Sequence, residues 1–597
     1  MSVPPQIDLS PARPELVTRE VPRQRRPWLA LMTATDHKQV GLLYIATALV
    51  SLVLALTLLV LMRVQLIVPE NTMIDPVTFD RFLSAYGATS IVLFALPLAI
   101  GFATYLMPLQ IGARGVALPR LAATSYWLYF FGAITLYASF LYSPPEGGTF
   151  ALPPLSDEAF SASSGIDAWI VGVGLAVLGF VLAAVNLVAT AHRERGPGMA
   201  WRRMPIFSWA STVISYQLLV AGPILLAALV MLFFDRHYDG AFFDSAEGGG
   251  PILYQHMSWI FFTSAYAAIV AFAAGVISEI LPVFSGKPLF SHRPAQWAIA
   301  AIAVLGFLAW MQNMYSADIA RGWLYLSMLA ALLLAVPIGV LIVSWIATLW
   351  SGAIRFRAPL LFALGAISTM SIGLSGEFAN SVIPVGWQVG NTAAAWQDTH
   401  YALIGAAVFA GFAALYYWFP KMTGRTMGEG LAHGSFWMML IGVNVMCMAM
   451  FFAGMEGQPV DIYRYYEGAG LDGYNLAASI GSFVLAIGVI LTLVNAALSV
   501  RHGARAGHDP WDGVTLEWFA PSPPPEHNFD AVPDVRSSAP LLEIREAVRR
   551  RTEAWRPPAR LERPPASAGE PEGAASAAPA GDGDGDGQDQ SPGSLSA

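Results

Sequence analysis

The chain has 597 residues, of which 55% are hydrophobic and only 12% are charged, and its mean hydropathy is +0.53. Soluble domains carry about 25% charged residues, so a soluble enzyme of this size is excluded. The net charge of −8 leaves no basic excess for binding nucleic acid. The single cysteine, Cys447, excludes a disulfide framework and a cysteine-rich metal or iron–sulfur site.

Apolar runs of about 20 residues, the length that crosses the hydrocarbon core of a bilayer as a helix, recur along the chain. We therefore expect an all-α integral membrane protein built as a bundle of twelve transmembrane helices. The expected spans lie near 41–65, 84–108, 122–142, 166–190, 208–234, 253–283, 296–315, 322–350, 357–383, 393–419, 432–455 and 471–499.

The segments outside the spans differ in composition. Residues 1–40 form a basic, proline-rich arm, and residues 41–500 form the transmembrane domain. Residues 501–556 form a C-terminal extension, and residues 557–597 are a low-complexity tail that we expect to be disordered. Loops after even-numbered spans carry twelve Lys and Arg, against five after odd-numbered spans. The positive-inside rule therefore predicts a multi-pass protein with both termini cytoplasmic.

Several segments of the chain resemble subunit I of the haem–copper oxidases, the catalytic subunit of cytochrome c oxidase. They run almost colinearly from about residue 35 to 535 and include "PLQIGARG" at 108–115, "GMAWRRMPIFSW" at 198–209, "ISEILPVFSGKPLF" at 277–290, "LYYWFPKMTGR" at 415–425 and "TLEWFAPSPPPEHNF" at 515–529. The resemblance implies a subunit-I-like fold and a place in respiratory electron transport in the cell inner membrane. It also implies contacts with membrane lipids and with subunit-II-like or subunit-III-like chains.

The resemblance further implies six histidines at membrane depth, which hold a low-spin haem, a high-spin haem and a copper ion. Five of these six positions are substituted in this chain. The substituting residues are Tyr86 for a low-spin haem ligand, Asp398 for the high-spin haem ligand, and Thr263, Gln312 and Asn313 for the three copper ligands. Only His400, at the second low-spin ligand position, remains.

Positions that support the chemistry in the family are changed as well. They are Ala265, Ala267, Leu341, Gly115, Thr104 and Ala122 at proton-path and tyrosine positions, Val460 and Asp461 at the propionate arginines, and Gly390 and Asn391 at the magnesium site. Arg63, which resembles the arginine beside the low-spin haem, is kept. We therefore expect no catalytic residue, no metal site, and either no cofactor or at most one haem, at His400, Tyr86 and Arg63.

Three functions remain open from the residues. The leading hypothesis is a pseudoenzyme that does not reduce oxygen itself and acts as a structural, assembly or regulatory partner of a respiratory complex. The first alternative is an electron-transfer protein or oxidase subunit that keeps a single haem at His400. The second is an ion or solute transporter in which Asp398, Thr263, Gln312 and Asn313 face the vacated cofactor cavity.

Overall fold

The structure, a computed structural model, describes residues 33–238 and 240–554. The predicted tail over 557–597 and most of the predicted arm over 1–40 lie outside the described residues. The chain divides into two units, Met1–Arg545 and Glu546–Ala597. The fold described below is that of the first unit.

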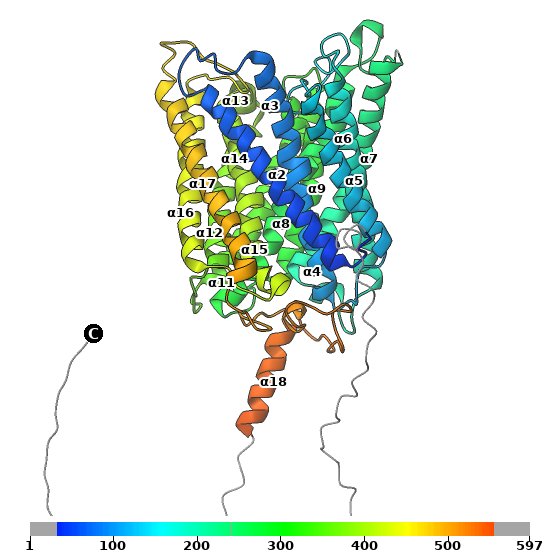
Figure 1. Cartoon of the computed structure of the whole chain (residues 1–597), viewed down its shortest axis with the longest axis vertical. Helices are drawn as coiled ribbons and strands as arrows, with labels where there is room; N and C mark the ends of the chain where they lie inside the picture. Colours follow the sequence, from blue (N-terminus) through cyan, green and yellow to red (C-terminus); the bar gives the residue numbers. More distant parts are fainter. Residues whose placement is uncertain (1–32, 239, 555–597) are drawn as a thin grey trace, which may run out of the picture. The chain divides into compact units, whose positions relative to one another are not determined.

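The first unit is a bundle of long helices that lie side by side, with loops at the two ends (Figure 1), and its described residues contain no strand. The first helices are α2 (His37–Gln65), α3 (Pro76–Ala88), η1 (Thr89–Ala95), α4 (Leu96–Ile111), α5 (Pro119–Ala138), η2 (Ser139–Leu141), α6 (Ser164–Arg193), η3 (Trp201–Arg203), α7 (Ile206–His237), η4 (Ser245–Glu247), α8 (Pro251–Ser285) and α9 (His292–Leu308). The later helices are η5 (Trp310–Met314), α10 (Arg321–Leu333), α11 (Ala335–Leu349), α12 (Ala358–Asn380), α13 (Ile383–Val389), α14 (Ala393–Leu403), η6 (Ile404–Phe409), α15 (Ala410–Thr423), α16 (Glu429–Met455), α17 (Asp472–His502) and η7 (Leu516–Trp518). The last helix, α18 (Pro540–Ala554), begins in the first unit and continues along the chain into the second.

Eleven helical segments of the described chain are long and apolar enough to cross a membrane, which confirms the predicted fold class. The remaining expected span, 122–142, is occupied by α5, which has 20 residues. A helix of this length is about 30 Å long and matches the hydrocarbon core. Its Tyr126, Trp127 and Tyr129 lower its hydropathy, so the count of strongly apolar spans is one less than the twelve expected.

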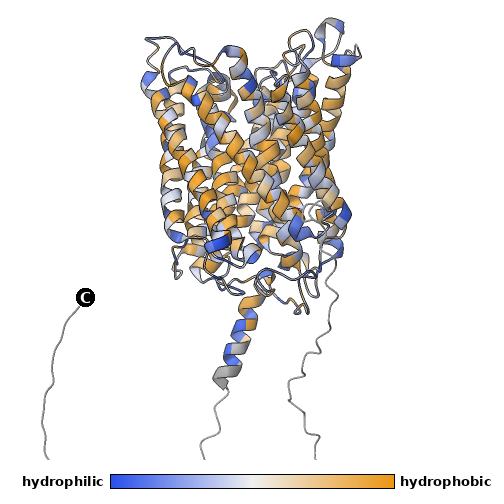
Figure 2. Ribbon diagram, in the orientation of Figure 1, coloured by the Kyte–Doolittle hydropathy of each residue, from blue (hydrophilic) through white to orange (hydrophobic). Residues whose placement is uncertain are grey.

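The burial of the spans separates central from peripheral helices. The most apolar windows of the spans Pro76–Ile111, Pro251–Ser285 and Ala393–Thr423 are 100%, 94% and 89% buried, whereas that of α17 is 39% buried. Apolar residues cover the length of the helices and polar residues gather at the two ends (Figure 2). Polar groups on the central helices therefore face other helices or internal cavities.

Two π-helical segments interrupt the central helices. The segment η1 follows α3 directly, and η6 follows α14 directly. All of their residues are buried. Wide turns of this kind are frequent at functional sites because they change the direction of the side chains around them. Tyr86 and His400 lie three and four residues before these segments, respectively.

The first part of the predicted C-terminal extension packs back onto the bundle. The carboxylate of Glu517 accepts hydrogen bonds from Gln110 Nε2 at 3.1 Å and from Trp418 Nε1 at 3.2 Å. The ammonium group of Lys421 donates to the carbonyl of Ala520 at 2.7 Å. These bonds bind the extension to α4 and α15 and close that end of the bundle.

Candidate functional site

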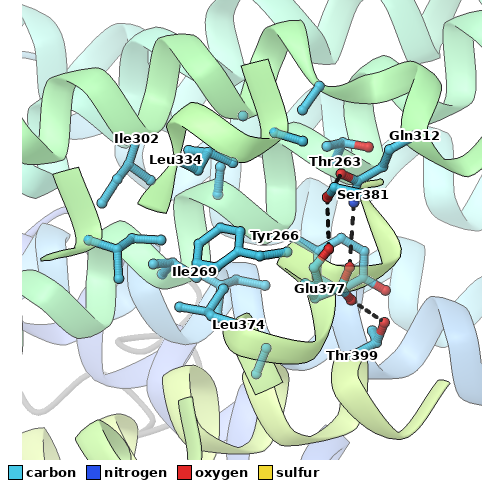
Figure 3. A pocket seen from close by; sticks show the side chains of 18 of the residues that line it. Thr263, Tyr266, Ile269, Ile302, Gln312, Leu334, Leu374, Glu377, Ser381 and Thr399 are labelled. Carbon is cyan, nitrogen blue, oxygen red and sulfur yellow. Dashed lines mark hydrogen bonds between the residues drawn. The ribbon is translucent and has the colours of Figure 1, made fainter. Parts of the chain in front are cut away.

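A cavity with about 860 Å³ of empty space, which includes space open to the surroundings, is lined by residues of α8, α9, η5, α10, α11, α12 and α14. We call it the polar cavity, since one side is apolar and the other carries hydroxyl, amide and carboxylate groups (Figure 3). Its polar lining residues are Thr263, Tyr266, Gln312, Asn313, Glu377, Ser381 and Thr399. The three positions that resemble copper ligands are thus brought together, as their register predicted.

Glu377 is the centre of a hydrogen-bond network in this cavity (Figure 3). Its Oε1 accepts from Thr399 Oγ1 at 2.8 Å, and its Oε2 lies 3.5 Å from Gln312 Nε2. The hydroxyl of Ser381 donates to the Glu377 carbonyl at 2.7 Å and lies 3.2 Å from Gln312 Oε1. The side chains of α12, η5 and α14 are therefore joined through one carboxylate.

Sequence reasoning missed Glu377. It lies in the predicted span 357–383, where an acidic residue among apolar ones is expensive and marks a functional position. The acidic residue in an apolar span could have indicated this position. The resemblance did not indicate it, because no oxidase ligand position falls on Glu377. Any relay or binding role of the polar cavity has to include Glu377.

The structure corrects the expected position of Asp398. Its side chain does not line the polar cavity but lies against Gly376 of α12, where an added Cβ would sit 2.0 Å from Oδ1. Asn380 Nδ2 donates to Asp398 Oδ2 at 3.0 Å, and Gln397 Nε2 donates to Oδ1. Because successive helix residues point about 100° apart, Thr399 takes the cavity-facing position and Asp398 does not.

A second cavity lies beside His400, and we call it the His400 cavity. It has about 580 Å³ of empty space, and Arg63, Tyr86 and His400 all line it. The Tyr86 hydroxyl lies 3.0 Å from His400 Nε2, and the two rings are parallel within 13°. His400 Nδ1 lies 2.8 Å from the Trp396 carbonyl, which fixes the ring so that Nε2 faces Tyr86. The three residues predicted as one site are therefore neighbours.

Arg63 supplies the positive charge of the His400 cavity. Its Nη2 lies 2.9 Å from the sulfur of Met450, and Val460 and Asp461 line the same cavity. A buried guanidinium that meets a thioether keeps most of its five donors free for another acceptor. The arrangement can therefore donate hydrogen bonds to a polar group of a bound molecule, while the carboxyl group of Asp461 in the same cavity balances part of the charge of Arg63.

The chain matches the family described as Cytochrome C and Quinol oxidase polypeptide I over residues 39–484. It is 39% identical over 546 residues to a probable cytochrome c oxidase subunit 1-beta of Nocardia farcinica, which covers 89% of this chain and 92% of that protein. It is 35% identical over 501 residues to cytochrome c oxidase subunit 1 of Thermostichus vulcanus, which covers 84% and 90%.

The fold is also similar to a solved structure. A chain of a heme-copper terminal oxidase dimer, solved by cryo-EM, superposes with a TM-score of 0.67 at 14% identity. The match covers 78% of this chain and 84% of that chain. This match supports the arrangement of the helices, and it carries no information on the role of any single residue.

These comparisons contradict the prediction of no cofactor or at most one haem. The relatives are cytochrome c oxidase subunits and the structural neighbour is a heme-copper oxidase, so the family points to haem. The His400 cavity fits one part of this requirement, because it presents an imidazole and a cation.

The copper part does not fit the residues present. Thr263, Gln312 and Asn313 offer neutral oxygen and amide groups, whereas copper selects imidazole and sulfur ligands. Asn313 Nδ2 lies 3.4 Å from Thr263 Oγ1, so these groups contact each other. Within the described residues, no group of three or more His, Cys, Asp or Glu side chains could hold a metal ion.

Proposed function

The chain belongs to the family of cytochrome c and quinol oxidase polypeptide I, and on this premise we propose that it is a subunit-I-like partner within a respiratory membrane complex. In this role the chain has a structural, assembly or regulatory function, and its polar cavity is not a site of oxygen reduction. It contacts subunit-II-like or subunit-III-like chains and lipids of the cell inner membrane. The proposal excludes oxygen reduction by this chain. It does not exclude a haem bound in the His400 cavity.

The observation that supports this function most is the hydrogen-bond network of the polar cavity. Gln312, Ser381 and Thr399 all interact with Glu377, so the groups at this depth satisfy one another. A buried network whose members are paired stabilises one arrangement of the surrounding helices. Such a cavity is consistent with a structural role for the chain.

Oxygen uptake tests the proposal directly. The complex is purified from membranes of a host without other terminal oxidases, and oxygen consumption is measured with reduced cytochrome c and with quinol. We expect other respiratory subunits to co-purify and oxygen uptake to stay at the level of membranes without the chain. Oxygen uptake that His400→Ala abolishes, or purification of the chain without any partner, contradicts the proposal.

A second function is favoured by the His400 cavity. His400 has its Nε2 fixed toward the cavity, and Arg63 lies on the same wall. A haem bound there would supply one-electron transfer; His400 would be its imidazole ligand, and Arg63 would meet its polar edge. Tyr86, whose hydroxyl lies within hydrogen-bonding distance of Nε2, would control access to that nitrogen.

The absorption spectrum tests whether the His400 cavity holds this haem. We expect the purified chain to show a Soret band that His400→Ala removes and that Tyr86→Phe shifts without removing. His256→Ala is the matched control, because this imidazole lies 3.1 Å from Trp310 Nε1, outside both cavities. A Soret band that survives His400→Ala excludes haem binding at this position.

A further inference from the structure

An open groove lies between α7 and α9, outside the two cavities described above. It encloses about 1830 Å³ of empty space, open to the surroundings. Its walls are formed by apolar residues such as Val213, Val220, Val304, Phe307 and Leu308. Val220 and Val304 are 54% and 61% exposed, so the bundle itself leaves this surface uncovered.

One end of the groove carries arginine and tryptophan side chains. Arg202 and Arg293 both line it, and neither guanidinium has an ion pair or hydrogen bond with another residue in the described part of the chain. Trp297, on the same helix as Arg293, is 73% exposed. Tryptophan favours the boundary between hydrocarbon and headgroups, which places this end of the groove at the headgroup level.

Hydrogen bonds between helices hold this end of the groove in one arrangement. Gln296 Nε2 donates to the Trp201 carbonyl at 3.0 Å, and Trp209 Nε1 donates to the Gln296 carbonyl at 2.8 Å. These bonds join η3, α7 and α9. Gln217 Nε2 donates to the Ala303 carbonyl at 3.2 Å and joins α7 to α9 deeper in the bilayer. The groove therefore has fixed walls.

The length of the groove matches one leaflet of a bilayer. Along α7 the lining residues run from Trp209 to Val220, and along α9 they run from Trp297 to Leu308, with Arg293 one turn beyond at the headgroup end. Each apolar wall is therefore about 16 Å long. Half of the hydrocarbon core is about 15 Å. A partner transmembrane helix would cross both leaflets, whereas the acyl chains of a lipid extend through one.

We propose that this groove is a binding site for an anionic glycerophospholipid, whose phosphate meets Arg202 and Arg293 and whose acyl chains lie along α7 and α9. Arginine recognises phosphate oxygens through its paired donors, and two unpaired guanidinium groups at headgroup level complement one negative headgroup. The site is independent of the proposed function, because it uses no residue of either cavity.

Native mass spectrometry of the detergent-purified full chain tests the site. Phosphatidylglycerol and phosphatidylcholine with identical acyl chains are compared on the native chain and on the Arg202→Gln/Arg293→Gln double variant. We expect phosphatidylglycerol to bind about 30-fold more tightly than phosphatidylcholine, and the double variant to lose this preference. Arg120→Gln is the matched control, because Arg120 is also exposed and lies outside the groove.

A second variant tests the groove itself. Ala300→Trp fills the space between the helices and should weaken binding of both lipids, while its melting temperature in detergent alone stays that of the native chain. Equal binding of the two lipids to the native chain, or unchanged phosphatidylglycerol binding by either groove variant, overturns the proposal. A photoreactive group at Trp297 that cross-links to a polypeptide instead of lipid overturns it as well.

Discussion

Glu377 is an unusual residue for the interior of a membrane bundle, because its described hydrogen-bond partners are neutral. Thr399 and Gln312 approach the two carboxylate oxygens, and Ser381 binds the backbone carbonyl of the same residue. A buried carboxylate without a cation is tolerated only when donors surround it. The donors of the network therefore stabilise the carboxylate of Glu377 in this position, and the carboxylate satisfies those donors.

We predict that Glu377→Leu lowers the free energy of unfolding by about 2 kcal/mol, because the donors of Thr399 and Gln312 lose their acceptor. Glu377→Gln, which keeps an acceptor oxygen, should cost less than about 1 kcal/mol. Unfolding in mixed detergent and dodecyl sulfate micelles measures both. A double-mutant cycle with Thr399→Val should show a coupling of about 1 kcal/mol, and strictly additive effects would count against the network.

Asp157, in the segment before α6, gives a second prediction. Its Oδ1 is buried without a hydrogen-bond partner among the described residues. Burial, together with the charges of Asp235 and Asp244, raises the pKa of Asp157 to about 6. The folded state then binds the proton more tightly than the unfolded state, so this carboxyl group favours folding at low pH and loses that contribution as pH rises through 6.

We therefore expect Asp157→Asn to be more stable than the native chain at pH 8 by about 1 kcal/mol, a value kept small because the carboxyl is partly exposed. The difference should shrink below pH 5, where the native carboxyl is protonated. Melting temperatures recorded from pH 4 to 8 measure the effect. A difference that is constant with pH would mean that Asp157 titrates normally.

At the scale of helices, apolar length predicted most spans but not their interruptions. The predicted span 471–499 agrees closely with α17 (Asp472–His502). The predicted span 322–350 is divided at Leu334 between α10 and α11. Pro337 explains this division, because it has no N–H to donate to the carbonyl four residues before it. Hydropathy alone does not predict this division, because it contains no information on the backbone N–H that proline lacks.

The site shows the same limit at finer detail. The family register brought Tyr86, His400 and Arg63 into one cavity, since residues aligned on a shared fold keep their helix faces. It misplaced Asp398, because the neighbouring side chains of a helix diverge and packing against Gly376 decides which of them faces the cavity. Which residues share a cavity was thus predictable from the family register, whereas the contacts of each side chain depend on local packing.

The pair α16 and α17 provides the element-scale prediction. A Cβ added at Gly442 would lie 2.4 Å from Leu485 N, and one at Gly481 would lie 2.4 Å from Met446 N. Small residues of this kind let membrane helices approach closely. We predict that Gly442→Leu lowers the free energy of unfolding by about 2 to 3 kcal/mol, since the helices have to separate.

Gly434→Leu is the matched control for this prediction. It lies on the same helix α16, and an added Cβ there meets nothing within 4 Å. Its stability should equal or slightly exceed that of the native chain, because leucine favours the helix over glycine. Equal losses in the two variants would show that glycine acts through the α16 backbone rather than through contact with α17.

For the whole molecule, the distribution of charge predicts the orientation in the membrane. The loops after even-numbered predicted spans hold twelve Lys and Arg, and those after odd-numbered spans hold five. We expect the basic loops of this chain to lie on the cytoplasmic side, because anionic lipid and the translocation machinery retain basic loops there. Ser245, after α7, and Ala353, after α11, are both exposed and lie in loops of the two opposite classes.

Labelling with a membrane-impermeant maleimide tests this orientation, and the chain is suited to it because its only cysteine, Cys447, is fully buried. We expect Ser245→Cys to be labelled in intact spheroplasts, and Ala353→Cys to be labelled only after the membrane is permeabilised. The native chain is the control and should stay unlabelled in both conditions. The reverse pattern would place the arginine-rich loops outside, and with them the arginine end of the lipid groove between α7 and α9.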